Sequence, residues 1–189
     1  MFYTATTRLK LGALGCSCGK KFKIDGKLWV WAQKKGCIHI GDNVRINSRF
    51  GSNLVGLTNP VVFQCLENGT IAIGNNSGLS SVVLSARSNI IIGDNVKIGA
   101  NVRVFDHDHH SLDSIFRRGG EDKSHVKTRP VVIGDDVFIG TNSIILKGVS
   151  VGNRSVIGAG SVVSCDVPAD EIWAGNPARF VKKLGVKNG

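Results

Sequence analysis

A six-residue repeat constrains the fold of this chain more than any other feature. From Ile133 the sequence runs without a slip through the hexads IGDDVF, IGTNSI, ILKGVS, VGNRSV, IGAGSV and VSCDVP. An aliphatic residue opens each hexad, and a small or β-branched residue takes its fifth position. Shorter runs of the same pattern begin at Ile92 and at Ile40. A period of six fits neither the period of about 3.6 of an α-helix nor the period of 2 of a simple long strand.

Turns that recur every six residues predict a triangular coil of about 18 residues. The first residue of each hexad points inward, and Gly or Asn occupies the turns that need a positive φ angle. Stacked coils then bury a continuous ladder of aliphatic side chains that no single coil could bury alone. A sandwich of antiparallel strands would instead need a turn every 8 to 12 residues, roughly, with strict alternation between the turns. The pattern does not by itself set the handedness of the coils.

Two segments break the repeat. Residues 105–129 leave it after Val104 and return to it at Pro130, and they are rich in Asp, His, Arg, Gly and Lys. Loops of this length inside a compact fold are usually functional or disordered. The second break, residues 51–69, indicates a smaller insertion or an irregular coil, and around residues 71–89 the register shifts by about one residue.

The two ends of the chain lack the repeat. Residues 1 to about 20 predict an irregular lead-in. Near the C-terminus, Asn176 is a candidate N-cap, Pro177 suits the first position of a helix and Gly185 suits its end. We therefore expect a β-helix domain over residues 1–175 and a short capping helix with a tail over residues 176–189.

Composition narrows the class of protein further. With 189 residues the chain predicts one domain, and its net charge of +10 would attract an anionic partner, namely nucleic acid, a membrane surface or a phosphorylated small molecule. Five scattered cysteines form no secreted disulfide framework, so we expect reduced thiols and a cytoplasmic protein. Arg8 and Lys10 interrupt the apolar run near the N-terminus, so neither a secretion signal nor a membrane span is expected.

The start of the long loop, VFDHDHHSLD over residues 104–113, concentrates the titratable groups. An imidazole with an unperturbed pKa of about 6.5 can accept a proton and return it near neutral pH. A carboxylate that accepts a hydrogen bond from the second ring nitrogen would hold the ring in one tautomer. His107, His109 and His110 could also bind zinc, although adjacent histidines do not easily face one ion.

The hexads, the His-bearing loop and the closing AGNPARFVKKL together resemble the hexapeptide-repeat acyltransferase family, whose fold is a left-handed parallel β-helix. The resemblance covers roughly residues 36–184. It is closest to the branch of galactoside and maltose O-acetyltransferases and of the acetyltransferases of capsule, lipopolysaccharide and exopolysaccharide synthesis. It implies an all-β chain with an excursion loop and the short C-terminal capping helix.

The resemblance also implies roles for residues of the loop. His110 falls on the family's catalytic position as the general base, and His109 and His107 are the alternatives because His109 stands where the family has an aromatic residue. Asp106 or Asp108 is the expected orienting group. Ser80, in SGLSS, is another candidate for that role.

Acetyl-CoA is the co-substrate that the resemblance implies, held in a groove between neighbouring subunits of a homotrimer. The residues expected to contact it are Gly140, Thr141, Lys147, Ala159, Ser164, Trp173, Pro177, Arg179 and Lys182. The other expected partner is a sugar or glycan acceptor. Neither a bound metal, nor nucleic acid, nor membrane insertion is expected.

These observations predict an acetyl-CoA-dependent O-acetyltransferase that acts on a sugar hydroxyl in surface polysaccharide or lipopolysaccharide synthesis. None of the five cysteines stands in a nucleophile's setting, so we expect direct transfer. The alternatives are N-acetylation of an amino sugar, a metalloenzyme of the carbonic anhydrase type and a noncatalytic scaffold.

Overall fold

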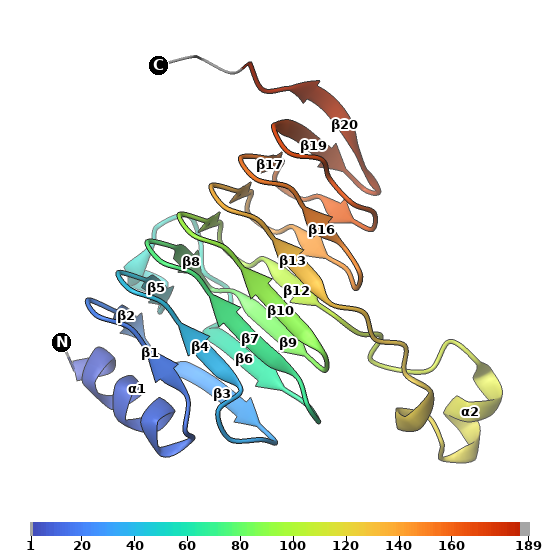
Figure 1. Cartoon of the computed structure of the whole chain (residues 1–189), viewed down its shortest axis with the longest axis horizontal. Coiled ribbons are helices and arrows are strands. Elements are labelled where there is room, and N and C mark those ends of the chain that lie inside the picture. Colours follow the sequence, from blue (N-terminus) through green and yellow to red (C-terminus); the bar gives the residue numbers. More distant parts are fainter. Residues whose placement is uncertain (1, 186–189) are drawn as a thin grey trace.

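The computed structural model describes residues 2–185 and shows a three-sided prism of stacked coils (Figure 1). Each side of the prism is a sheet to which successive coils contribute parallel strands. Helix α1 (Phe2–Ala13) lies at one end, and helix α2 (Ser114–Gly119) lies in a loop that protrudes from the middle coils. Two short 3-10 helices, η1 (Phe50–Ser52) and η2 (Lys123–His125), belong to the two breaks in the repeat.

The strands of the three sheets follow each other in rotation along the chain. Sheet A holds β1 (Ser17–Cys18), β4 (Ile38–Ile40), β7 (Thr70–Ile73), β10 (Asn89–Ile92), β13 (Val131–Ile133) and β16 (Ser150–Val151). Sheet B holds β2 (Lys23–Gly26), β5 (Arg45–Ser48), β8 (Gly78–Ser80), β11 (Lys97–Ile98), β14 (Phe138–Ile139), β17 (Val156–Ile157), β19 (Glu171–Gly175) and β20 (Ala178–Lys183). Sheet C holds β3 (Leu28–Ala32), β6 (Val61–Cys65), β9 (Val83–Ala86), β12 (Arg103–Phe105), β15 (Ile144–Ile145) and β18 (Val162–Val163).

The first residue of each hexad points into the prism, as the sequence predicts. The residues at these positions, each no more than 2% exposed, are Ile133, Ile139, Ile145, Val151, Ile157 and Val163. Ladder pairing aligns them between coils; in sheet A, Ile92 pairs with Ile133 and Ile133 with Val151. The core is therefore a column of aliphatic side chains whose rungs each contact the rung before and the rung after.

The corners of the prism use glycine differently from the expectation. The positive φ angles fall largely on polar residues such as Asn95 at 58° and Asp136 at 58°, which adopt the left-handed region more readily than most side chains do. Glycine in the second position of a hexad is instead needed for close approach. A Cβ on Gly140 would lie 2.5 Å from the backbone nitrogen of Ala159 in the next coil. The repeat therefore fixes how closely the coils stack as well as where the chain turns.

The predicted register shift around residues 71–89 is one extra residue in one coil. Ile73 pairs with Ile92, 19 positions along the chain, whereas Ile133 pairs with Val151, 18 positions along. The smaller insertion is shorter than expected, because residues 61–65 already form strand β6 of sheet C.

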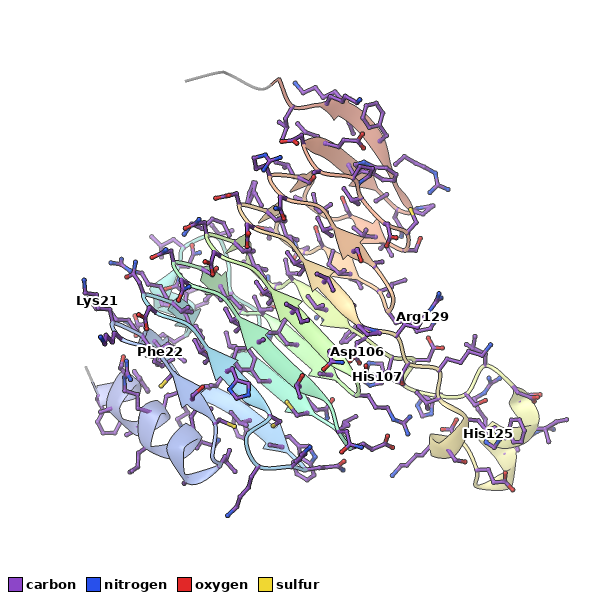
Figure 2. All side chains as sticks on the ribbon, in the orientation of Figure 1. Lys21, Phe22, Asp106, His107, His125 and Arg129 are labelled. Carbon is purple, nitrogen blue, oxygen red and sulfur yellow. The ribbon has the colours of Figure 1, made fainter. Side chains whose placement is uncertain are left out.

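The expected irregular lead-in over residues 1 to about 20 is wrong for most of its length. Residues 2–13 form helix α1, which buries Leu11 in the hydrophobic core and Thr7 beneath it. The open first coil leaves apolar side chains such as Phe22 uncovered on one side, and the helix covers that end of the core (Figure 2). No helix within residues 2–185 is both long and apolar enough to cross a bilayer.

The expected C-terminal helix is also wrong. Strands β19 and β20 form an antiparallel hairpin in which Gly175 pairs with Ala178, and the turn holds a cis peptide bond between Asn176 and Pro177. Without the hairpin, strand β17 would be the last strand of sheet B and one of its edges would be unpaired. Strand β19 pairs with this edge in parallel. Pairing the free backbone N–H and C=O groups of that edge stabilises a strand here more than the local helix signals of Asn176 and Pro177 stabilise a helix. The expected tail at residues 186–189 lies outside the described residues.

The ladder predicts a strong difference between neighbouring residues of strand β11. Ile98 is 3% exposed in the core, whereas Lys97 points to solvent. We expect Ile98→Ala to lower the free energy of unfolding by about 2–5 kcal/mol, because it leaves a cavity between rungs that cannot collapse freely. Lys97→Ala should change it by less than about 0.5 kcal/mol. Urea unfolding at one protein concentration measures both, and equal effects would contradict the ladder.

Candidate active site

The excursion loop, residues 105–129, leaves the prism at the corner between sheets C and A. It follows strand β12 and returns to β13, and its two arms pair near the base, where His107 forms an antiparallel bridge with Thr128. Farther out, the Asp113 carboxylate accepts a hydrogen bond from the backbone nitrogen of Ile115 and caps helix α2. The rings of Phe116 and His125 stack with centroids 3.4 Å apart. The loop is thus an ordered extension of the prism, as Figure 1 shows.

Asp106 anchors the base of the loop. Its side chain is fully buried, and its two oxygens accept hydrogen bonds from the backbone nitrogens of Arg87 at 2.8 Å and Ser88 at 2.7 Å. The same carboxylate meets Nδ1 of His107 at 2.9 Å (Figure 2). Asp106 therefore orients an imidazole, as the sequence predicts for Asp106 or Asp108, but the ring that it orients is that of His107.

His107 is a buried ring with one unused nitrogen. Asp106 takes Nδ1, while Nε2 is buried and has no hydrogen-bond partner among the described residues. The ring of His109 packs edge-on against it, with centroids 4.8 Å apart. His107 lines the same pocket as His109, but its side chain is only 2% exposed, which favours a supporting role over direct contact with a substrate.

His109 lies over a pocket at the base of the loop. Its ring is held edge-on by Phe105, at a centroid distance of 4.9 Å, and by His107. The pocket has a volume of about 160 Å³, and its other lining residues include Glu67, Arg87 and Lys123. Partial burial, followed by the charges that His107 and His110 would carry, lowers the pKa of His109 below its usual value. The lowered pKa favours the neutral form of the His109 ring, which is the form that can accept a proton.

His110 points away from this pocket. Its side chain is 71% exposed, and Nδ1 lies 2.5 Å from Oδ2 of Asp122. Asp122 also accepts a hydrogen bond from the backbone nitrogen of Ser111 at 2.7 Å, and these two bonds lower the pKa of the carboxyl group. Sequence reasoning missed Asp122, because no spacing rule links it to a histidine twelve positions earlier in a polar loop.

Asp108 pairs with Lys147. The Nζ atom of Lys147 lies 2.6 Å from Oδ1 of Asp108, and both side chains are largely buried. Of the two expected orienting groups, Asp106 is therefore the one that contacts a histidine. Lys147 reaches the loop because it follows strand β15, which pairs with β12, and its expected contact with a coenzyme phosphate stays a prediction.

The other residues expected to contact acetyl-CoA lie mostly along a different corner. Gly140, Thr141 and Ala159 follow strands β14 and β17 at the corner between sheets B and C, where Gly140 and Ala159 stack in successive coils. Ser164 lies after β18 at the corner between sheets C and A. The whole width of sheet C separates the first group from the excursion loop within one chain.

The residues of the C-terminal hairpin extend the corner between sheets B and C. Pro177 is exposed in the hairpin turn, and Arg179 and Lys182 are exposed on β20. Trp173 pairs in register with Ile157 and packs against the core, and its Nε1 donates to Glu171 at 2.8 Å. Its side chain therefore closes the end of the core, and the expected contact with adenine stays a prediction.

Ser80, the other expected orienting group, lies in strand β8 of sheet B, next to the corner with sheet C. Its hydroxyl accepts hydrogen bonds from Nδ2 of Asn47 and Nδ2 of Asn53, each at 3.1 Å. It is therefore on the side of the prism away from the loop of its own chain.

The described residues give little support to metal or cysteine chemistry. Within residues 2–185, His, Cys, Asp and Glu form no group suited to a metal ion, and burial raises the pKa of the Cys37 and Cys65 thiols.

Comparison with known proteins agrees with this fold. Residues 130–165 match the family model "Hexapeptide repeat of succinyl-transferase". The galactoside O-acetyltransferase of Escherichia coli K12 is 42% identical over 129 residues, which cover 66% of this chain and 59% of that protein. Among solved structures, the D94N mutant of AntD, an N-acyltransferase from Bacillus cereus in complex with dTDP and coenzyme A, matches with a TM-score of 0.74 and 25% identity over 95% of this chain and 91% of that one. The hexapeptide-repeat acetyltransferase VCA0836 of Vibrio cholerae, complexed with acetyl coenzyme A, matches with a TM-score of 0.58 and 29% identity over 96% and 88%.

The chain belongs to the hexapeptide-repeat acyltransferase family, whose fold is the left-handed β-helix. The expected resemblance and fold class are thereby confirmed, apart from the C-terminal helix. The chain spans 59% of the length of the Escherichia coli galactoside O-acetyltransferase.

The buried anchor predicts unequal effects of two loop aspartates. Asp106→Ala leaves two partly buried backbone N–H groups and the buried His107 ring without their acceptor, so we expect a loss of about 3–5 kcal/mol of stability. Asp113→Ala, which removes an exposed N-cap, should cost about 1 kcal/mol. Thermal unfolding gives the ranking, and limited proteolysis should cut the excursion loop faster in the first variant. Equal proteolysis of the two variants would contradict the anchor.

Proposed function

We propose that this protein is an acetyl-CoA-dependent O-acetyltransferase that acts on a sugar hydroxyl. The observation that carries the proposal is the imidazole of His109 on the wall of a pocket at the base of the excursion loop, in a hexapeptide-repeat fold. The identity of 42% to a galactoside O-acetyltransferase supports the choice of a hydroxyl acceptor. Surface polysaccharide or lipopolysaccharide is the class of acceptor that we infer from the resemblance.

The loop favours His109 over His110 as the general base. A base must be neutral before the reaction and must lie beside the reacting atoms, and His109 combines a lowered pKa with a place on the pocket wall. His110 lies outside the pocket and is bound to Asp122. Sequence reasoning ranked His110 first because it falls on the family's catalytic position, and the sequence alone does not show that His109 lines the pocket.

The proposed reaction needs only proton transfer and charge stabilisation from the protein. His109 takes the proton of the acceptor hydroxyl as the oxygen attacks the thioester carbonyl carbon. The C–S bond then breaks, and the departing thiolate takes the proton back from His109. The buried, high-pKa thiols give no support to a cysteine nucleophile, so the acetyl group passes directly from donor to acceptor.

Two subunits would be needed to complete the site. His109 stands at the corner between sheets C and A, whereas Gly140, Thr141 and Ala159 stand at the corner between sheets B and C. A homotrimer with cyclic symmetry would bring the first corner of one subunit against the second corner of the next. In that arrangement acetyl-CoA binds along the second corner, with Arg179 and Lys182 near its phosphates and with Ser80 of the neighbour facing the loop.

An amino sugar is the second candidate acceptor. The structure of AntD, an N-acyltransferase in complex with dTDP and coenzyme A, matches over 95% of this chain. An amine attacks a thioester in the same geometry as a hydroxyl and gives up its proton to the same base. The fold therefore serves either acceptor, and the atoms that choose between them lie in the loops.

Substitution of the adjacent histidines tests the assignment of the base. We expect His109→Ala to lower kcat by roughly 100-fold or more, the usual contribution of a positioned base, and His110→Ala to lower it by less than about tenfold. The acid limb of kcat/KM should have its midpoint below about 6.5, because the lowered pKa of His109 keeps the ring neutral to a lower pH. Release of coenzyme A measures turnover, and circular dichroism checks the fold.

A large loss in His110→Ala together with a small loss in His109→Ala would transfer the role of base to the pair of His110 and Asp122. Unchanged turnover in both variants would remove the catalytic assignment and leave the scaffold hypothesis.

Acceptor choice is tested by assaying matched sugars side by side. We expect acetyl transfer from acetyl-CoA to galactosides and glucosides at a rate at least tenfold above that to their amino-sugar counterparts at equal concentration. Mass spectrometry of the product identifies an ester or an amide. A product that carries only an amide would replace O-acetylation with N-acetylation and would leave the role of His109 intact.

A further inference from the structure

The positive charge of this protein gathers at the end of the prism opposite the proposed coenzyme site. Residues 1–35 hold eight of the 24 basic residues and one of the 14 acidic residues, and therefore carry +7 of the net charge of +10. The one acidic residue, Asp25, pairs with Arg49 at 2.6 Å. Acetyl-CoA, which we place at the late coils, does not account for this charge.

Five lysines of this segment lie around the whole first coil. Lys20 and Lys21 lie between strands β1 and β2, Lys27 lies between β2 and β3, and Lys34 and Lys35 follow β3. Each of the three corners of the coil therefore presents exposed ammonium groups, and Lys21 points outward in Figure 2. None of these five lysines forms an ion pair with a carboxylate of residues 2–185.

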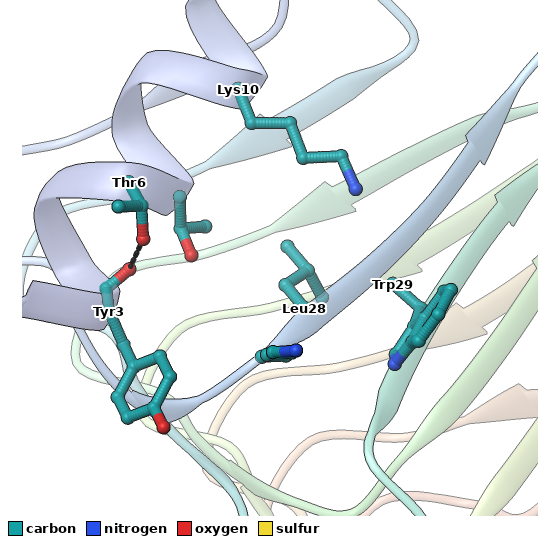
Figure 3. A pocket seen from close by; sticks show the side chains of 7 residues that line it. Tyr3, Thr6, Lys10, Leu28 and Trp29 are labelled. Atoms are coloured by element: carbon teal, nitrogen blue, oxygen red, sulfur yellow. Dashed lines mark hydrogen bonds between the residues drawn. The ribbon is translucent and has the colours of Figure 1, made fainter.

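Large apolar side chains are exposed among the lysines. Phe2 and Leu9 of helix α1 are 75% and 78% exposed, and Trp29 and Trp31 on the outer face of β3 are 57% and 63% exposed. Lys10 of α1 and Trp29 face each other across a groove between the helix and β3, as Figure 3 shows. We call this surface, formed by α1 and the first coil (residues 2–35), the basic end.

We propose that the basic end binds the surface of a lipid bilayer that contains anionic lipids. Lysines around this end supply attraction to negatively charged headgroups, and phenylalanine and leucine of helix α1 supply the apolar contacts that sit at the boundary between headgroups and acyl chains. Nucleic acid would use the lysines but would leave Phe2 and Leu9 in water, and a second copy docked end to end would bring one set of +7 charges against another. The inference does not depend on acyl transfer.

The test measures binding of the full chain to sedimented vesicles. We expect binding to vesicles of equal parts phosphatidylglycerol and phosphatidylcholine, little binding to phosphatidylcholine alone, and weakening as salt rises above about 0.1 M. Replacing Lys20, Lys21, Lys34 and Lys35 by Gln should weaken binding at least tenfold, since each lysine near an anionic surface is worth roughly a fivefold change.

The matched charge control replaces four exposed basic residues elsewhere by Gln, namely Lys97, Arg103, Arg118 and Lys127, and keeps the same net charge. It should bind within about twofold of the unaltered chain. Equal loss in both variants would mean that net charge alone drives binding, and would overturn the proposal.

The apolar contribution is tested by Phe2→Ser with Leu9→Ser, against a control of Leu54→Ser with Val55→Ser in the insertion after η1. Only the first pair should weaken vesicle binding. Unchanged binding in both pairs, or binding of a single-stranded oligonucleotide but not of vesicles, would contradict a bilayer partner.

Discussion

The stacking of aliphatic side chains from coil to coil is the interaction on which the rest of this structure depends. Each rung contacts its two neighbours and the backbone ladders bind it in register, so a corner can be extended without disturbing the rungs on either side. The excursion loop is such an extension. It leaves after Val104 and rejoins at Val131, and both residues are buried in the same column. Ordering this loop costs conformational entropy, and the hydrogen bonds of Asp106 to the backbone of Arg87 and Ser88 in the preceding coil offset part of that cost.

The loop separates two kinds of histidine by their surroundings. His107 is buried and hydrogen-bonded to a carboxylate, and its ring packs edge-on against that of His109. Partial burial of His109, followed by the positive charge that its neighbours could carry, lowers the pKa of this ring and disfavours its protonation. The ion pair of Asp108 and Lys147 joins the base of the loop to the coil that follows it.

The repeat made the central architecture predictable, whereas the structure at the two ends of the chain could not be predicted. Six hexads in one register specify which side chains face inward, and that information is local. Helix α1 and the β19–β20 hairpin, in contrast, respond to surfaces that exist only once the coils have stacked, so the helix signal of Asn176 and Pro177 was misleading. The same limit applies to the site. The loop and its candidate residues could be found in the sequence, whereas the orientation of His109 and the contact of His110 with Asp122 depend on how the polar loop folds back.

The C-terminal hairpin has a consequence for the behaviour of the molecule in concentrated solution. A column of parallel rungs ends in strands whose backbone groups could accept a rung from another molecule, which is how fibrous polymers grow. Strand β20 runs against the direction of every other strand in its sheet, so an incoming parallel rung finds the wrong spacing of donors and acceptors. The remaining strands at that end, β16 and β18, are only two residues long. A protein that turns its last strand around in this way resists growth by end-to-end addition and stays a discrete particle.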